Sequence, residues 1–503
     1  MTVQVTAPER LGGPTPRPAN PGRLAPWSRG SLAWLVAVVS LVFFATAQYC
    51  RQLHVDTYFD LYVGRYVSEH GIPERNVVTV MAHGQPWIDQ QWLAQLMYYR
   101  AWQVGGYAAV TLLSVALVSA GSAVLGALML RRGVSPLAMC TWTLAAIAVS
   151  YGYATPRAQS FGYLLVPLVL MLVLHDDGRR LPRASTWLLI PLLVVWANVH
   201  GSVLLGAGFV GLHAARRAWA AQRRQDRLGL ASYLLLAAGA AVSVICTPYG
   251  FGVVRYYGSL IGNPELSRNV AEWGPPSLAT PYSWAFFAVA IAAMSAVALG
   301  WRRGNRPQLE LAIFGAITFA VALLAFRNTP WFGFAGCLLA AEMLAGRSGS
   351  RTAAVSFRRM LAAVLVACAV VVTTGLAFEP ARQYESSIPH RAIDVTDRVT
   401  DNHPQLSVLA DQLSAVGLLW LHPAELGRVA FDVRVEQYNQ AELAAIFEFV
   451  DADRSHWQGV LRGYDVVVVS RRQHPSLAAA ILREPGWRVV YADSAGVVVE
   501  RSG

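Results

Sequence analysis

The sequence predicts an α-helical polytopic membrane protein with about 11 transmembrane helices and a C-terminal α/β domain. The chain has 503 residues, of which 55% are hydrophobic and only 14% are charged. Soluble domains carry about 25% charged residues, so this composition indicates a membrane protein. Apolar runs of about 15–24 residues recur between arginine-rich breaks, as membrane spans do. A polar tail with alternating strand-like and helix-like runs follows them.

The chain is expected to divide into three parts. Residues 1–30 are rich in proline and arginine and predict a disordered cytoplasmic segment. Residues 31–378 predict the transmembrane domain, with a long first outer loop at 50–106. The first apolar run ends in "ATA", which resembles a cleavage site, but the many later runs favour an uncleaved anchor. We expect spans at 31–49, 107–130, 136–153, 160–175, 185–199, 201–215, 229–246, 282–300, 308–326, 330–345 and 360–378.

The distribution of arginine predicts how these spans are oriented. The chain has no lysine, so its net charge of +11 comes from arginine alone. If the N-terminus is cytoplasmic, the inner segments hold 21 arginines and the intervening outer loops only eight, as the positive-inside rule requires. The basic charge therefore marks cytoplasmic loops and argues against a nucleic-acid partner. We expect a multi-pass protein of the inner (plasma) membrane, with its C-terminal domain extracytoplasmic.

Residues 379–503 are expected to form that soluble α/β domain. The runs "LSVLAD", "GRVAFDVRV", "YDVVVVSR" and "WRVVYADSAGVVVER" are typical of strands, and "NQAELAAIFEFV" and "HPSLAAAILRE" of helices. The five cysteines are scattered and none lies in the tail, so neither a disulfide framework nor a cysteine metal site is indicated.

The first outer loop holds the residues that first suggest chemistry. Asp56 and Asp60 are four residues apart and would share one helix face. A second segment, "WIDQQWLAQLMYYRAW" (residues 87–102), is amphipathic and too short to span, so it predicts a helix along the membrane surface before a "GG" turn. The simplest interpretation is two interfacial helices with solvated acids.

Further polar residues recur at the predicted outer ends of spans. They are Arg157, Asn198, His200, Glu272, Arg327 and Asn328. Such residues can simply reach the membrane interface, but acids and bases gathered on one side suggest a polar cavity that opens outward. Arginine side chains there would bind a phosphate, and a nearby carboxylate would accept a proton from an acceptor hydroxyl.

Several segments resemble the GT-C superfamily of membrane glycosyltransferases. More closely, they resemble a bacterial multi-span family described as glycosyltransferase-like. Its first-loop pattern, D-x-W-W-H-L-x-x-G-R, is met by "DTYFDLYVGR" at Asp56, Leu61, Gly64 and Arg65. Its "HEWLAE", "N-x-HG", "NPYG" and "EW" segments are met by "QQWLAQ", "NVHG", "TPYG" and "EWGPP", and its tail segments by "GLLWLHP" and "FDVRVEQY". The chain departs from the pattern at Asp60, Gln91 and Thr247, where His, Glu and Asn are expected.

The resemblance implies transfer of a sugar from a polyprenyl-phosphate donor to a cell-envelope glycan, lipid or protein on the outer face. It implies Asp56 as the general base with Asp60 second, and Arg157, His200 and Arg327 as ligands of the donor phosphate. Glu272 is a further substrate contact, and the remaining substrate-binding candidates are Arg65, Asp89, Gln91, Asn198 and Asn328. Asp89 lies close by and is a candidate to replace the acid that is missing at Gln91. No cofactor is implied with certainty: a divalent metal is possible, but the sequence does not support one.

Other functions remain open. A non-catalytic relative would bind lipid-linked glycan during envelope assembly, which the changes at Asp60 and Gln91 would allow. A transporter or flippase is less well supported, because internal repeats are not visible. A ligase or polymerase acting on lipid-linked glycans is a further alternative. In the tail, Asp432, Arg434 and Tyr438 are either contacts to a glycan acceptor or an ion pair at a strand end with a packed aromatic ring.

Overall fold

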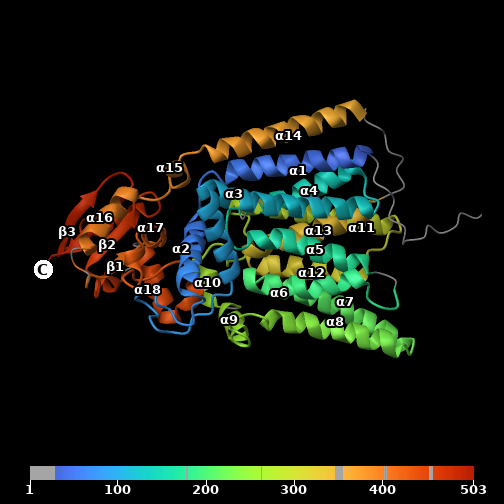
Figure 1. Cartoon of the computed structure of the whole chain (residues 1–503), viewed down its shortest axis with the longest axis horizontal. Helices are drawn as coiled ribbons and strands as arrows, with labels where there is room; N and C mark the ends of the chain where they lie inside the picture. The colour runs from blue at the N-terminus through green and yellow to red at the C-terminus, as the bar shows by residue number, and fades with distance from the viewer. Residues whose placement is uncertain are drawn as a thin grey trace, which may run out of the picture.

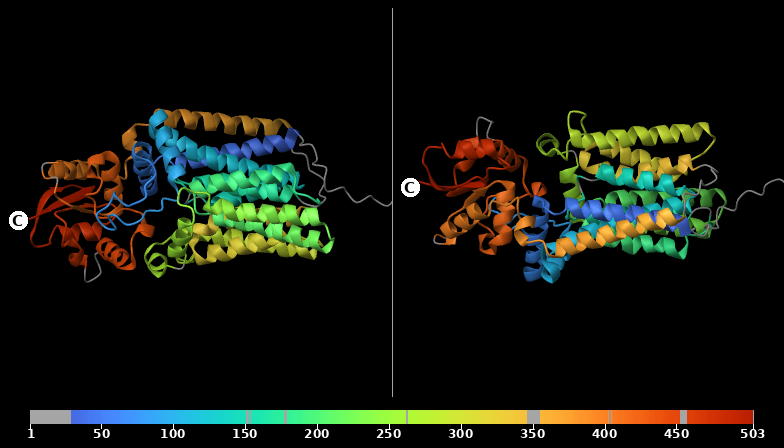
Figure 2. Two further views of the ribbon diagram at one scale, coloured as in Figure 1. Left: turned by 60° about the horizontal axis from the view of Figure 1, so that its bottom comes forward. Right: turned by 90° about the horizontal axis from the view of Figure 1, so that it is seen from above.

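The computed structural model describes residues 29–150, 152, 154–176, 179–261, 263–345, 355–401, 403, 405–451 and 457–502. The predicted disordered segment 1–30 therefore lies, except for its last two residues, outside them. A bundle of long helices forms one end of the molecule and a mixed α/β domain the other (Figure 1). The two further views in Figure 2 show the same division.

The bundle helices agree in order and position with the predicted spans. In the described part of the chain they are α1 (Arg29–Tyr49), α3 (Trp92–Arg131), α4 (Pro136–Ser150), α5 (Ser160–His175), α6 (Leu189–Val199), α7 (Val203–Arg223), α8 (Arg227–Ile245), α11 (Trp284–Arg302), α12 (Leu309–Leu324), α13 (Thr329–Leu344) and α14 (Val355–Ala377). Four described segments are long and apolar enough to cross a membrane by length and composition alone, and several shorter apolar helices run beside them. The predicted fold class is confirmed.

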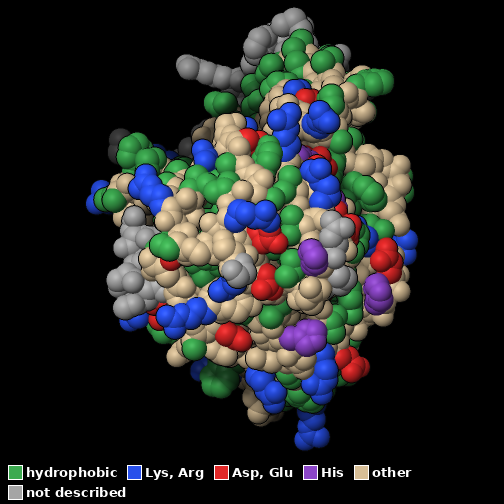
Figure 3. Space-filling model, turned by 90° about the vertical axis from the view of Figure 1, so that its left-hand side faces the viewer, with side chains coloured by type: hydrophobic (Ala, Val, Ile, Leu, Met, Phe, Trp, Pro, Cys, Tyr) green, Lys and Arg blue, Asp and Glu red, His purple; other side chains and the backbone are tan. Residues whose placement is uncertain are grey.

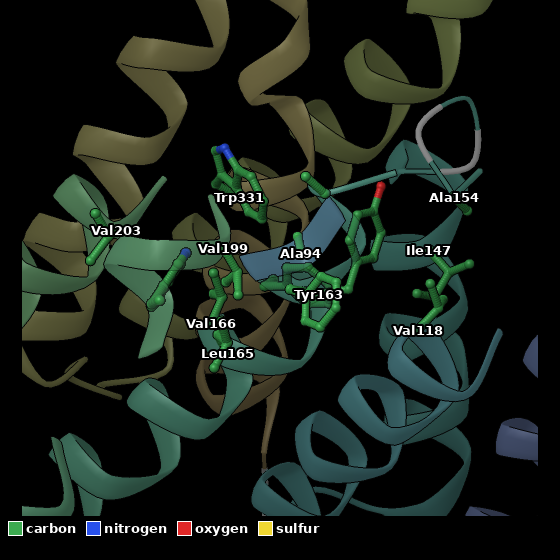
Figure 4. Packing of buried hydrophobic residues seen from close by; sticks show 14 of the residues in the cluster. Ala94, Val118, Ile147, Ala154, Tyr163, Leu165, Val166, Val199, Val203 and Trp331 are labelled. Atoms are coloured by element: carbon green, nitrogen blue, oxygen red, sulfur yellow. The ribbon is translucent and has the colours of Figure 1, made fainter. Parts of the chain in front are cut away.

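Small residues allow the bundle helices to pack closely. A Cβ atom on Gly121 of α3 would lie 2.0 Å from the carbonyl oxygen of Tyr163 of α5, so only glycine fits this crossing. The ring of Tyr163 in turn lies 6.3 Å from that of Trp331 of α13. Figure 4 shows these two rings among buried aliphatic side chains of neighbouring helices. This core supports the first turns of α5 and α13, next to which the candidate site lies.

The first outer loop forms two helices that run across the ends of the bundle (Figure 1). They are α2 (Val55–His70) and the first part of α3, which bends where Gly105 and Gly106 leave helical geometry. Gly106 has a φ of +61°, which favours glycine. The predicted surface helix is therefore present, but it begins at Trp92 rather than residue 87. A Cβ on Gly64 would lie 2.2 Å from the carbonyl oxygen of Gln95, so α2 and α3 are in close contact.

Short helices complete the end of the bundle that faces the C-terminal domain. They are α9 (Gly252–Leu260) and α10 (Pro264–Asn269), together with the 3-10 turns η3 (Pro281–Ser283) and η4 (Phe326–Asn328). The turn η2 (Ala184–Leu188) lies at the opposite end of the bundle, where α6 begins. Asn263 caps α10, because its side chain accepts a hydrogen bond from the backbone N–H of Glu265.

The C-terminal domain contains a four-stranded mixed sheet in the order β1-β2-β4-β3. Its strands are β1 (Val408–Ala410), β2 (Val466–Ser470), β3 (Trp487–Ala492) and β4 (Gly496–Arg501). β1 is parallel to β2, and β4 is antiparallel to β2 and β3. All five residues of β2 are buried, as expected for a strand with helices on both faces.

Two helical layers cover this sheet. Val466 and Val468 of β2 face a core shared with α16 (His390–Asp401) and α17 (Gln412–Leu421). The alternate residues Val467 and Val469 face a second core. That core includes side chains of α18 (Gln440–Val450), η7 (Trp457–Leu461) and α19 (Pro475–Ile481). The remaining short elements are α15 (Ala381–Tyr384), η5 (Pro423–Glu425) and η6 (Val435–Gln437). On the face of the domain that looks away from the bundle, acidic and basic side chains are interspersed (Figure 3).

One predicted strand is wrong. Residues 427–435 do not join the sheet as a strand, because their ladder contacts are isolated bridges from Val429 to Val408 and to Thr79. Part of the segment pairs with the first outer loop instead: Val80 donates to the carbonyl of Val429, and Met81 to that of Ala430. Its alternating apolar residues were a correct sign of extended backbone, but the partner is too distant in sequence to be predicted.

Candidate functional site

A cavity of about 480 Å³ lies between the C-terminal domain and the ends of the bundle helices nearest to it. It is lined by α2, by the segments at these ends of α5, α6 and α12, by α9 and α10, and by residues 433–436 of the C-terminal domain. Seven of the predicted site residues line it together: Asp56, Asp60, Gln91, Arg157, His200, Glu272 and Arg327.

The two acids of α2 lie in different environments. The side chain of Asp56 is 31% exposed, whereas Asp60, one turn deeper, is only 2% exposed. An Oδ2 atom of Asp60 accepts a hydrogen bond of 2.8 Å from the backbone N–H of Ala158. Burial raises the pKa of Asp60 well above its ordinary value, and the charge of Asp56 raises it further. Asp60 therefore favours its neutral form and fixes the position of the 154–159 segment.

Asp56 is held in its ionised form. Burial acts to raise its pKa, but the positive charge of Arg157 and a hydrogen bond from it outweigh that effect, with help from His54, and the pKa lies below its ordinary value. Nη1 of Arg157 lies 2.7 Å from Oδ2 of Asp56. Asp56 is thus an accessible carboxylate at the cavity wall.

Charges alternate from Asp56 across the cavity. Nη1 of Arg157 also lies 3.5 Å from Oε2 of Glu272, and Oε1 of Glu272 lies 3.4 Å from Nη1 of Arg327. The guanidinium of Arg327 stacks 4.0 Å from the ring centre of Trp273, an additional favourable contact for a cation. Two arginines therefore face a common space, each partly balanced by a carboxylate that an incoming anion could replace.

Backbone pairing explains why Glu272 and Arg327 lie together although 55 residues separate them. The N–H of Arg327 donates to the carbonyl of Glu272 at 2.9 Å, and the N–H of Phe326 donates to that of Gly274 at 2.8 Å. The loop after α10 is thus fixed against the start of α13, and both side chains are directed to the cavity wall.

His200 contributes a hydrogen-bond donor rather than a positive charge. It follows α6 in extended geometry, and its Nδ1 accepts from the backbone N–H of Ser202 at 3.2 Å and lies 2.7 Å from the hydroxyl of that serine. The proton of the neutral ring is therefore assigned to Nε2. Burial, together with Arg327 and Arg157, lowers the pKa of His200 to about 3. Any role in phosphate binding is limited to one neutral hydrogen bond.

Four predicted substrate-binding residues do not line the cavity. Arg65 donates to two backbone carbonyls at the end of α17, at 2.7 and 3.0 Å. Asn198 donates to carbonyls of α6 and of the residue after α8, and Asn328 to one of α12. Asp89 is 4% exposed and precedes α3, and burial raises its pKa to about 7. Arg65, Asn198 and Asn328 therefore hold helix ends in place. Residue type alone cannot distinguish this role from ligand binding.

The tail residues Asp432, Arg434 and Tyr438 form a buried cluster. Nε of Arg434 lies 2.7 Å from Oδ2 of Asp432, and both side chains are 0% exposed. The hydroxyls of Tyr438, at 3.0 Å, and of Tyr62 from α2 also donate to Asp432. The ion pair and packed ring of the simpler interpretation are present, although not at a strand end. Arg434 additionally lines the cavity.

Glu436 is a lining residue that sequence reasoning missed. It lies within the segment "FDVRVEQY", is partly buried, and brings a carboxyl from the C-terminal domain into the cavity. Burial raises the pKa of Glu436, against the positive charges of Arg434 and Arg327. The similarity of this segment to the glycosyltransferase-like family was the only signal in the sequence.

Comparisons with known proteins agree with the predicted superfamily at the level of fold. No protein-family model matches the chain, and no curated protein matches it. The crystal structure of ArnT from Cupriavidus metallidurans in the apo state superposes with a TM-score of 0.51 over 93% of this chain and 97% of that chain, at 16% identity. A second structure of ArnT, bound to undecaprenyl phosphate, gives a TM-score of 0.48 over 94% and 98% of the two chains, at 15% identity. ArnT is a GT-C glycosyltransferase, and the chain has the fold of this polytopic membrane superfamily.

Proposed function

We propose that the protein is a membrane glycosyltransferase that moves a sugar from a polyprenyl-phosphate donor to a hydroxyl of a cell-envelope acceptor. The observation that carries the proposal is the ionised, accessible Asp56 beside Arg157 and Arg327 in one cavity. The GT-C fold shared with ArnT supports the reaction class.

The donor phosphate would lie between Arg157 and Arg327. Arginine binds phosphate oxygens through two parallel hydrogen bonds, and both side chains now pair with carboxylates that the phosphate would displace. The Nε2–H of His200 adds a neutral donor. A phosphate here would place the first sugar carbon near Asp56, while the lipid chain extends toward the apolar outer ends of the bundle helices.

The chemical step requires one base and one leaving-group site. The acceptor hydroxyl transfers its proton to the Asp56 carboxylate as its oxygen attacks the first sugar carbon. The bond from that carbon to the phosphate oxygen breaks, the phosphate leaves with the electron pair, and the configuration inverts. The arginines stabilise the negative charge that develops on the leaving phosphate. The same phosphate, lying close to Asp56, raises its pKa and makes it a stronger base when the donor is bound.

Glu436 and Gln91 are proposed to contact the acceptor or the transferred sugar. Both line the cavity, and Glu436 comes from the C-terminal domain, so that domain would help to select the acceptor. Asp60 is proposed to position the segment that carries Arg157 rather than to accept the proton.

Replacing Arg327 by alanine tests the phosphate site. We expect Arg327→Ala to weaken binding of undecaprenyl phosphate, the lipid present in one ArnT structure, by roughly 10- to 150-fold, because a hydrogen bond to a charged group contributes about 1.5–3 kcal/mol. Binding is measured by quenching of intrinsic fluorescence in detergent. Arg255→Ala, which removes an exposed arginine of α9 outside the cavity, is the control. Equal affinities for both variants would exclude this phosphate site.

The proposed orientation places the cavity and the C-terminal domain outside the cytoplasm. In a chain whose five cysteines are replaced by serine, Ser502→Cys should react with a membrane-impermeant maleimide in intact spheroplasts. Gln222→Cys, exposed at the end of α7, should react only after lysis. The reverse pattern would contradict the arginine-based topology.

A further inference from the structure

The C-terminal domain carries a second group of acids, away from the cavity. Asp397 and Asp401 lie one turn apart on α16, and Glu425 ends η5. One carboxylate oxygen from each of the three lies within 4.8 Å of the others. None of the three lines the cavity described above.

Glu425 is the innermost member of this group. It is 0% exposed. Its Oε1 accepts a hydrogen bond of 2.5 Å from the hydroxyl of Thr400 and lies 3.4 Å from Nη1 of Arg428. Its Oε2 is buried and has no hydrogen-bond partner among the described residues. Buried polar atoms are rarely left without a partner. This second oxygen is therefore suited to bind a cation through its lone pairs.

The nearby bases only partly balance the acids. His422 lies between Asp394 and Asp397, with nitrogen–oxygen distances of 3.3 and 3.0 Å. Arg428 pairs with Oε1 of Glu425. The group therefore carries repulsion that a bound positive charge would relieve.

We propose that Asp397, Asp401 and Glu425 bind a calcium ion. Carboxylate oxygens are hard ligands of the kind that calcium prefers, and calcium accepts a flexible, partly hydrated coordination shell. Asp401 is exposed, which gives the ion an entry path and leaves room for water ligands. Three carboxylates without a complete protein shell correspond to the weak sites of extracellular modules, with dissociation constants of about 10⁻⁴–10⁻³ M.

Such an ion would position the segment that leads to the cavity. Glu425 stands just before the residues that pair with the first outer loop, where Gly427 donates to the carbonyl of Val78 at 2.8 Å. The same segment continues to Arg434 and Glu436 in the cavity wall. Calcium would thus fix α16 to the start of this segment.

The test is a calcium titration of the full chain in nanodiscs after chelator treatment, followed by thermal unfolding. We expect 10 mM calcium chloride to raise the Tm of the wild type by about 5 °C, with a half-maximal effect near 1 mM. Asp401→Asn, an exposed and conservative change, should abolish the shift. Asp394→Asn removes the same charge from the same helix outside the trio and should retain it.

Two results would overturn the proposal. One is a wild-type Tm that does not respond to calcium chloride. The other is an equal response of wild type and Asp401→Asn, which would show that the ion acts elsewhere. An equal response to magnesium chloride would overturn the assignment to calcium. None of these readouts requires glycosyl transfer, so the inference stands or fails independently of the proposed reaction.

Discussion

Asp56→Asn is expected to lower the turnover of sugar transfer by about 10²- to 10⁴-fold, the usual contribution of a general base. Asparagine keeps the size of the side chain but cannot accept the proton of the acceptor hydroxyl. The variant should still bind undecaprenyl phosphate, because loss of the carboxylate releases Arg157 from its 2.7 Å ion pair. Transfer is measured in bilayers with labelled polyprenyl-phosphate sugars and a cell-envelope extract as acceptor.

Asp60→Asn is the matched variant for this experiment. Asp60 favours its neutral form, which asparagine imitates, so the loss of turnover should be much smaller than at Asp56. A larger loss of turnover for Asp60→Asn than for Asp56→Asn would identify Asp60 as the base. Binding of the donor without turnover by the wild type, across the panel of sugars, would instead favour a non-catalytic lipid–glycan binding protein.

The pH profile supplies an independent check on the base. In the free enzyme the pKa of Asp56 lies below its ordinary 3.8, so kcat/KM should stay level from neutral pH down to about pH 4 and fall only below it. The bound phosphate raises this pKa, so the acid limb of kcat should lie at higher pH than that of kcat/KM. Coincident acid limbs would argue against a phosphate beside Asp56.

Asp432→Asn is expected to have the largest effect on stability, about 3–5 kcal/mol. The substitution leaves the buried guanidinium of Arg434 without its counter-ion, and it weakens the contact from Tyr62 of α2. For a domain of this size the Tm should fall by on the order of 10 °C, measured by tryptophan fluorescence.

Two controls distinguish a buried charge from the loss of any ion pair. Glu500→Gln breaks the pair with Arg488, whose side chain is 72% exposed, and should cost less than about 1 kcal/mol. The double variant Asp432→Leu/Arg434→Met removes both charges and should recover part of the loss. Equal destabilisation by Asp432→Asn and Glu500→Gln would contradict the importance of burial.

Local patterns in the sequence predict most of the fold. Each bundle helix coincides with a separate apolar run, and all four strands of the sheet begin and end within predicted runs. The strand prediction for residues 427–435 was wrong because an extended segment has the same residue pattern whether it pairs within a sheet or with a loop about 350 positions away. The pattern of residues 87–102 likewise predicted a helix but not its first residue, because Trp87 packs as part of the preceding loop.

The site was predictable only in part, for a related reason. Of the eleven site residues that the sequence predicts, seven line one cavity. Asn198 and Asn328 do not line it, because their side chains donate hydrogen bonds to backbone carbonyls of neighbouring helix ends. The direction of a side chain is not visible in the sequence. Glu436 enters the cavity because of how the C-terminal domain is seated, which no short segment of the sequence specifies.

The pairing of the first outer loop with residues near Val429 has a consequence for biosynthesis. Arg434 donates to Asn76 across 358 positions of the chain, so one wall of the cavity is made by residues that are synthesised long after α2. The acids of α2 are therefore without that wall until residues 433–436 have been synthesised and the C-terminal domain has folded against the first outer loop. A nascent chain that lacks these residues would possess the carboxylates but not the enclosed cavity.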